Sequence, residues 1–141
     1  MTQDSPVTLS SDVAFTPAVK AAQAQRSAHP VHTRIEAAGG FRTGVTPDLV
    51  AFLAGVDTAF LGTATADGQP YVQHRGGPPG FIRPLDGETL GLADFAGNRQ
   101  YVTIGNLSEN SRAFLFLMDY AHRRRVKIWG TAEVVEGQGE K

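Results

Sequence analysis

The sequence predicts a mainly β protein, a closed or partly closed antiparallel barrel with helices at its ends. The 141 residues include 16 glycines and 8 prolines, which favour many turns and short elements. About six strand-like segments follow one another through short turns, and short turns connect antiparallel strands most simply. Closing such a sheet removes its exposed edges, so a barrel is the expected arrangement.

Residues 1–45 are expected to form an N-terminal extension with one helix. Residues 1–12 are polar and predict no regular structure. Thr16 followed by Pro17 is typical of a helix start, and the alanine-rich run to about Ala28 favours the helix itself. The span His29–Gly44 mixes charges with glycines and is predicted to be a connector.

A folded domain is expected over residues 46–135, followed by a tail at 136–141 without structure of its own. It opens with a short helix that begins at Thr46-Pro47 and ends near Gly55. The other predicted elements are strands Thr58–Thr65, Tyr71–His74, Phe81–Leu85 (an edge or bulge at Pro84) and Thr89–Ala93, a helix Asn98–Leu107, a buried strand Arg112–Met118 and a strand Arg125–Val135.

Composition excludes several classes of function. A net charge of −1 gives no reason to expect nucleic acid as a partner. The chain has no cysteine, which removes disulfides, thiolate metal sites and cysteine nucleophiles, and its four histidines show no metal-ligand spacing. The sequence has neither a signal peptide nor a run long enough to span a membrane, so a cytoplasmic protein without a metal is expected.

Two glycine-bearing segments carry arginines suited to an anionic ligand. Arg75 is expected between the strand Tyr71–His74 and a glycine loop, where backbone N–H groups can approach a ligand. Arg99 is expected at a helix start, with Asn98 and Gln100 as further donors. A guanidinium group matches phosphate geometry. The same spacing also fits two solvated surface arginines, and the residues alone leave both interpretations open.

Other polar residues allow more than one interpretation. His74 could donate to a phosphate or be an ordinary histidine at a strand end. The basic run 123–127 fits a solvated turn, a nucleic-acid patch, or strand positions directed at the same anion as Arg75. Asp94 and Asp119 are typical of turns, and no serine lies in a nucleophile elbow. No catalytic residue is assigned.

Several segments in a fixed order carry a family resemblance: PYVQHRGGPPGF, TLGLADFAGNRQY, GNL, RAFLFLMDY and RRRVKIWG. Through them, residues from about Asp57 to Val135 resemble the pyridoxamine 5′-phosphate oxidase-like family, the FMN-binding split β-barrels. The resemblance implies a split barrel and a homodimer with FMN in a groove between its subunits. It also implies an oxidoreductase that reacts with a small-molecule substrate or electron donor through the flavin ring.

The resemblance also implies which residues hold the flavin. One strand would line the flavin with Gln73, His74 and Arg75. A second segment would hold its ribityl and phosphate part through Ala93, Asp94, Asn98, Arg99 and Gln100. Arg125 would reach the flavin from the partner subunit.

Alternatives remain beside the flavin-dependent enzyme. The same fold could serve a non-catalytic flavin-binding or flavin-sensing protein, an interaction module without cofactor, or a barrel that uses deazaflavin or haem. Members of this family usually add another strand and a C-terminal segment, which in the true oxidases helps to bind the substrate. This sequence ends at Lys141. The resemblance therefore leaves the substrate open, as well as the choice between NADH and NADPH.

Overall fold

The structure is a computed structural model that describes residues 9–92 and 101–135. The chain divides into two compact units, Met1–Thr46 and Pro47–Lys141. The first unit is helical, and the second contains all six strands of the described residues. The mainly β class with flanking helices and six antiparallel strands is confirmed, although the strands form two sheets rather than a continuous closed barrel.

The first unit contains the helix that the sequence predicts. This helix, α1, spans Pro17–Arg26, and the Thr16 Oγ1 atom accepts a hydrogen bond from the backbone N–H of Val19 at 3.2 Å. Proline at the first helical position loses no hydrogen bond, because that N–H group has no partner within a helix. The local sequence therefore determines where α1 starts.

Two predictions for this unit are wrong. Part of the expected connector is a helix, α2 (Val31–Ala37), and the polar N-terminal region includes a 3-10 helix, η1 (Ser10–Val13). The α2 helix ends at Ala37 and is followed by Gly39 and Gly40, whose φ angles are 96° and 95°. Their N–H groups donate to the carbonyl groups of Glu36 and Ile35 in the last turn of the helix. Two glycines in this left-handed conformation are a common helix stop.

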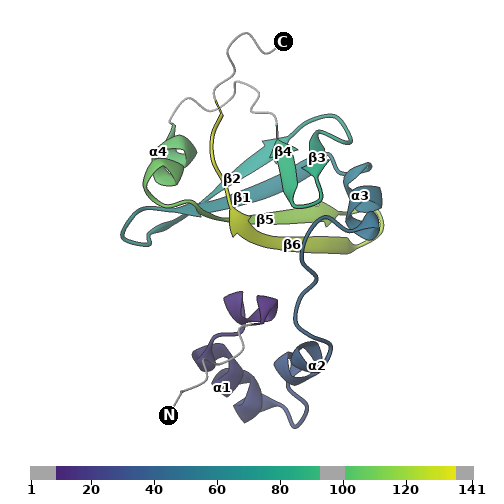
Figure 1. Ribbon diagram of the computed structural model, residues 1–141, viewed down its shortest axis with the longest axis vertical. Helices are drawn as coiled ribbons and strands as arrows, with labels where there is room; N and C mark the ends of the chain where they lie inside the picture. Colours follow the sequence, from purple (N-terminus) through teal and green to yellow (C-terminus); the bar gives the residue numbers. More distant parts are fainter. Residues whose placement is uncertain (1–8, 93–100, 136–141) are drawn as a thin grey trace, which may run out of the picture. The chain divides into compact units, whose positions relative to one another are not determined.

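The second unit is built on a four-stranded antiparallel sheet in the order β2-β1-β5-β6 (Figure 1). These strands span Pro70–Gly76, Thr58–Ala64, Arg112–Asp119 and Arg124–Thr131 in that order. A separate antiparallel hairpin is formed by β3 (Ile82–Asp86) and β4 (Thr89–Leu92). Its register shifts between Pro84 and Asp86, so the irregularity predicted at this proline is confirmed.

Two helices lie at opposite ends of this sheet (Figure 1). The first, α3, spans Pro47–Leu53, as the sequence predicts. The second, α4, spans Val102–Glu109 and therefore starts later than the predicted Asn98. Its N-cap residue Tyr101 has a φ of 60°, which interrupts any helical path from the preceding residues. Residues 98–100 lie outside the described part of the chain.

Three strand predictions need smaller corrections. Arg75 lies inside β2 rather than in the loop after it. The last strand, β6, ends at Thr131 instead of Val135. The predicted buried strand β5 is mostly half-buried, with Leu117 as its fully buried member. One face of β5 contacts the core and the other does not, and this is the usual condition of an antiparallel strand.

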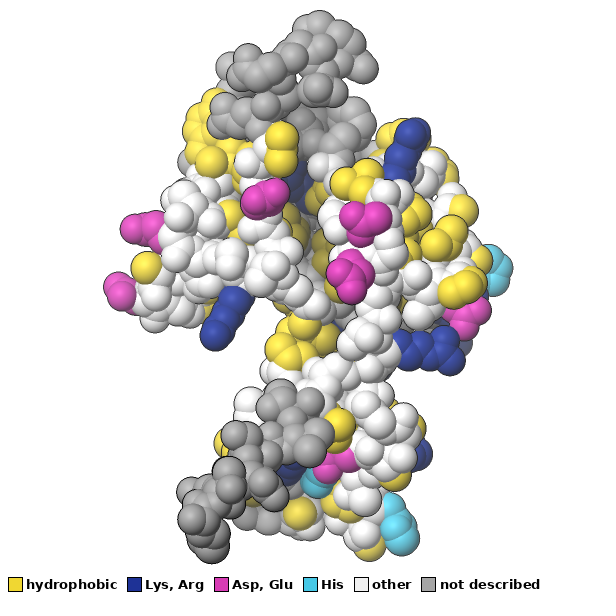
Figure 2. Space-filling view, viewed as in Figure 1, with side chains coloured by type: hydrophobic (Ala, Val, Ile, Leu, Met, Phe, Trp, Pro, Cys, Tyr) yellow, Lys and Arg dark blue, Asp and Glu magenta, His cyan; other side chains and the backbone are white. Residues whose placement is uncertain are grey.

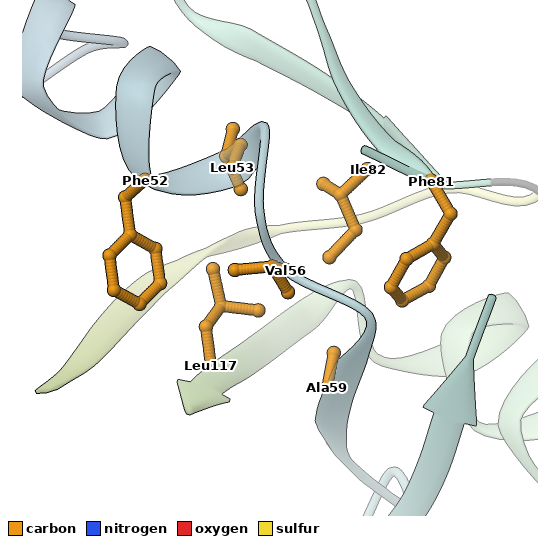
Figure 3. Close-up of a cluster of buried hydrophobic side chains, with 7 residues drawn as sticks. All are labelled: Phe52, Leu53, Val56, Ala59, Phe81, Ile82 and Leu117. Atoms are coloured by element: carbon orange, nitrogen blue, oxygen red, sulfur yellow. The ribbon is translucent and has the colours of Figure 1, made fainter. Parts of the chain in front are cut away.

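The core of the second unit joins the two sheets to α3. Seven side chains converge there (Figure 3): Phe52, Leu53, Val56, Ala59, Phe81, Ile82 and Leu117. Leu53, Ile82 and Leu117 are at most 1% exposed. Since these residues come from α3, β3 and β5, the core holds the β3–β4 hairpin over one face of the four-stranded sheet. The strand β2, at the edge of that sheet, supplies the candidate site.

Candidate functional site

The predicted site residues of β2 lie on opposite faces of the sheet. Ala59, which is buried in the core, pairs with Arg75, and Leu61 pairs with Gln73. His74 instead pairs with Phe60 on the other face. Successive side chains of a strand alternate between faces, so Gln73 and Arg75 share the core face while His74 does not. The structure therefore brings together only two of these three residues.

A polar contact connects Gln73 to the first turn of α4. The Thr103 hydroxyl donates to the Gln73 Oε1 atom at 2.6 Å, and Thr103 is only 5% exposed. One turn further along, Asn106 Nδ2 donates to Thr63 Oγ1 at 3.0 Å. These two contacts fix α4 against the core face of β1 and β2.

The same contacts give the direction of α4. Beyond its C-terminal end, Asn110 Nδ2 donates to the backbone carbonyl of Thr65 at 3.1 Å, next to the β1–β2 turn. Towards its N-terminus the helix passes Thr63 and then Gln73. Arg75 is the next residue of β2 on that face, so the N-terminus of α4 points along β2 towards Arg75. Free N–H groups and a partial positive charge are therefore directed to the side of the sheet that carries this guanidinium.

Arg75 itself is held in a partly enclosed position. It is half-buried, and its Nε atom is shielded from solvent. Directly after β2, the N–H group of Gly77 donates to the carbonyl of Asp57 at 3.2 Å, which keeps the end of β2 against the start of β1. A charged group in partial burial interacts more strongly with an anion than an exposed one. The half-buried guanidinium, the Gln73 amide and the helix N-terminus together make a donor set that suits a phosphate.

The remaining residues predicted for the phosphate lie outside the described residues. They are Ala93, Asp94, Asn98, Arg99 and Gln100, in the segment that connects β4 to α4. The described residues next to this segment are Leu92 at the end of β4 and Tyr101 before α4. Tyr101 is 62% exposed and left-handed, and such backbone strain in a residue other than glycine is often found beside functional sites.

The opposite face of the four-stranded sheet is rich in aromatic side chains. Phe60 lies edge-on to the His74 ring at 5.4 Å, and Phe114 contacts Trp129 with 5.0 Å between ring centroids. His74 Nε2 also lies 2.7 Å from the Thr58 hydroxyl. We call this surface the aromatic face; its members, identified by cross-strand pairing, are Val72, His74, Phe60, Phe114, Phe116, Trp129, Arg125 and Lys127.

Arg125 belongs to the aromatic face because it pairs with Met118, two residues beyond Phe116. Arg125 and Arg75 therefore lie on opposite faces of the sheet. The interpretation in which Arg125 or Lys127 joins Arg75 at one anion within a single chain is excluded by this arrangement. The neighbouring Arg124 stacks on Phe52 instead, with its guanidinium carbon 5.4 Å from the ring centroid.

The described surface that is visible in Figure 2 carries no dominant charge of one sign. On the face drawn in Figure 2, acidic and basic side chains are interspersed. In the β5–β6 turn, a hydrogen bond from the side chain of His122 holds the pKa of Asp119 below its ordinary value of 3.8. Within residues 9–92 and 101–135, no group of histidine, aspartate and glutamate side chains has the geometry of a metal site.

Sequence reasoning missed Thr103, Thr63 and Asn106 as residues that position the site. Thr103 and Asn106 are three residues apart, so they share one face of a helix. Both are nearly buried, at 5% and 7% exposure. Two polar residues on the inner face of a short helix are a signal for contacts with polar strand residues, and this pattern could have indicated Gln73 as a partner.

Comparison with known proteins identifies the family. Residues 45–141, more than half of the chain, match the family described as pyridoxamine 5′-phosphate oxidase. The chain therefore belongs to the pyridoxamine 5′-phosphate oxidase family, and the resemblance seen in the sequence is confirmed.

A solved structure supports the fold. The crystal structure of a tagged variant of HupZ from Group A Streptococcus is similar, with a TM-score of 0.51 and 23% sequence identity. The similarity covers 67% of this chain and 74% of the HupZ chain. None of the curated proteins matches the sequence. Among the described residues, no helix has the length and apolar character needed to cross a bilayer.

Proposed function

We propose that this protein binds FMN beside the edge strand β2 and acts as an FMN-dependent oxidoreductase. The observation that carries the proposal is the convergence of Arg75, Gln73 and the N-terminus of α4, together with membership of the pyridoxamine 5′-phosphate oxidase family. Arginine and helix N-termini are the groups that proteins commonly use for phosphate. A cytoplasmic location stays a prediction.

In this proposal the residues of the chain bind and orient the cofactor. Arg75 supplies the charge and Gln73 an amide, which Thr103 holds in place. Asn98, Arg99 and Gln100 remain predicted donors from the adjoining segment. FMN would supply the redox chemistry, since a flavin ring exchanges electrons or hydride with a substrate or a nicotinamide donor. Neither a catalytic acid nor a catalytic base is assigned.

We further propose that two copies of the chain associate through the aromatic face. Val72 is 63% exposed, and the phenylalanines and Trp129 beside it are only half-buried. Aromatic residues with a nearby arginine are enriched in the cores of protein interfaces. In a dimer of this kind, Arg125 and His74 would lie at the interface between the two copies.

The test of cofactor binding is a visible-light titration of the purified protein with FMN. We expect a flavin absorbance and quenched flavin fluorescence on binding. Arg75→Ala should weaken FMN binding by roughly 1.5–3 kcal/mol, the cost of a lost hydrogen bond to a charged group. Arg112→Ala is the matched control, because Arg112 is exposed and pairs with Thr131 at the other end of the sheet. Its affinity for FMN should equal that of the wild type.

Three outcomes would contradict the cofactor proposal. A folded protein that takes up no FMN would overturn it, and a spectrum typical of haem or deazaflavin would replace FMN with that cofactor. An unchanged affinity in Arg75→Ala would remove Arg75 from the site. Steady oxidation of NADH or NADPH by the flavin-loaded protein would distinguish an enzyme from a flavin-binding or flavin-sensing protein.

The test of the dimer is sedimentation of the wild type and of Val72→Asp. An aspartate at this exposed position should leave the fold intact but bury a charge in the proposed interface, so the variant should become monomeric. Val50→Asp is the control, because Val50 is 43% exposed on α3 and lies outside the aromatic face. A strictly monomeric wild type would rule the dimer out.

A further inference from the structure

The helix α4 is composed mostly of residues that disfavour a helix. Its eight residues, VTIGNLSE, begin with three β-branched side chains and include Gly105 in the interior. β-Branched residues, glycine, asparagine and serine all have a lower helix propensity than alanine or leucine. An isolated helix of this length is also too short to be stable in water. The local sequence therefore does not account for the stability of α4.

Two backbone features make this helix weaker still. Tyr101, its N-cap residue, provides no side-chain capping hydrogen bond and has a left-handed backbone with φ 60° and ψ 23°. That conformation is unfavourable for a residue with a Cβ atom. At Gly105, an added Cβ atom would meet nothing within 4 Å, so packing does not require a glycine there. Glycine in a helix interior nevertheless lowers helix stability relative to alanine.

The buried contacts between α4 and the sheet are polar. Thr103 and Asn106 are the buried residues of the helix, and their partners are Gln73 on β2 and Thr63 on β1. Among the described residues, neither the hydrophobic core nor the apolar side chains packed against it include a member of α4. Most surface helices are held instead by an apolar face that packs on the core. Hydrogen bonds give a smaller net stabilisation, because water replaces the lost partner when the helix leaves.

We propose that α4 opens as a local unit while the sheet stays folded, and that only its closed state binds the anionic cofactor. An element with few contacts to the core opens at a lower free energy than the core itself. When α4 opens, the Thr103 hydroxyl leaves the Gln73 amide, and the helix N-terminus is lost from the side of the sheet that carries Arg75. A ligand that needs both groups therefore binds only the closed helix, and binding and closure are coupled.

This coupling rests on the proposed FMN site, whereas the local opening is a property of the ligand-free protein. The two parts are tested by separate measurements on the full chain.

The local opening is tested by native-state hydrogen exchange of the ligand-free, ¹⁵N-labelled protein, followed by NMR at low urea concentrations. Amides of β5, an inner strand of the sheet, provide the reference for global unfolding. We expect the amides of α4 to be about tenfold or more less protected than those of β5. Their exchange should depend little on urea, because a local opening exposes little surface. Equal protection of α4 and β5 would overturn the proposal.

A substitution outside the helix separates local opening from global unfolding. Val56→Ala truncates a core side chain that is 2% exposed and lies outside α4. It should speed the exchange of β5 roughly tenfold, because global unfolding becomes easier, and leave the exchange of α4 unchanged. Equal acceleration of both elements would show that α4 opens only with the whole fold.

A substitution within the helix tests whether its own stability limits the opening. Gly105→Ala raises the helix propensity of α4 without a new contact, so exchange of its amides should slow about fivefold. Gly55→Ala is the matched control, since an added Cβ atom there also meets nothing within 4 Å, and it should leave the exchange of α4 unchanged. An unchanged α4 in Gly105→Ala would contradict the proposal.

The coupling is tested by the same exchange measurement with FMN. At a free concentration of about 100 times Kd, a ligand that binds only the closed state should slow exchange about a hundredfold in both α4 and β5. Slower exchange in β5 alone would show that the open state also binds FMN, and would overturn the coupling. A protein that takes up no FMN would overturn the proposed function and the coupling together, while the ligand-free measurement still decides the local opening.

Discussion

Thr103 holds α4 in position against β2 through its hydrogen bond to Gln73. Thr103→Val keeps the shape of the side chain but removes the donor to Gln73. A buried acceptor left without its donor costs about 1–2 kcal/mol, so the free energy of unfolding should fall by that amount. Urea denaturation followed by circular dichroism measures this change. FMN affinity should fall as well, because Gln73 loses the contact that orients its amide.

A matched control for this substitution is Thr131→Val. Thr131 is exposed at the end of β6, and its change should alter stability by less than about 0.5 kcal/mol. Equal stability of Thr103→Val and the wild type would mean that the hydrogen bond contributes nothing to the docking of α4.

The sequence named candidate site residues on β2 but did not predict the faces of the sheet on which they lie. Gln73 and Arg75 were expected at one site and do share a face, but His74 was grouped with them and lies on the other face. Side chains alternate between faces along a strand, so a predicted strand that included Arg75 would have placed His74 on the face opposite Gln73 and Arg75. Arg125 could not be placed in this way, because its face depends on how β6 pairs with β5.

At the scale of elements, the turn between β5 and β6 contains an Asp119–His122 pair that should make the stability of the fold depend on pH. The side chain of His122 lies 2.9 Å from the Asp119 carboxylate and lowers its pKa. A carboxylate with a lowered pKa stabilises the folded state above its unfolded pKa, and this contribution is lost as the pH falls through the folded value. Asp119→Asn should therefore lower Tm at about pH 6 but have no such effect once the pH is below the folded-state pKa of Asp119.

The direct measurement is the titration of the Asp119 carboxyl carbon by NMR. In His122→Gln its pKa should rise towards 3.8, because the main cause of the shift has been removed. The effect on Tm should be small and should decrease with salt, since His122 is 74% exposed. A Tm difference that grew as the pH fell would contradict the assigned direction.

Elements were predicted where the local sequence carries its own start and stop. Thr16-Pro17 gave α1 and Thr46-Pro47 gave α3. The α2 helix was missed although Pro30 precedes it and two glycines follow it, because its mixed charges suggested a loop. The first turn of α4 was placed too early because Tyr101 adopts a left-handed conformation. This conformation is uncommon for residues other than glycine, so a tyrosine in the sequence does not indicate it.

For the molecule as a whole, we predict that a chain beginning at Thr46 folds without the first unit. Within the described part of the chain, the seven buried hydrophobic residues of the core lie between Phe52 and Leu117, so the second unit has its own core. The shortened chain should unfold in one cooperative transition, as single domains of this size do. Circular dichroism and a dispersed NMR spectrum would measure this.

As a control, the FMN affinity of the shortened chain should be compared with that of the full chain. If the first unit plays no part in the site, the two affinities should agree. An unfolded or aggregated product would show that the second unit needs residues 1–45.

The sequence by itself determined the family, the mainly β class and the residue types that suit an anion. These follow from motif order, turn residues and periodicity, which are properties of neighbouring residues. Only the tertiary structure decided which of these residues meet. The pairing of β1 with β2 and β5 places Arg75 on the core face and His74 and Arg125 on the aromatic face. Strand pairing and helix docking join residues far apart in the chain, and their register depends on the packing of the whole core.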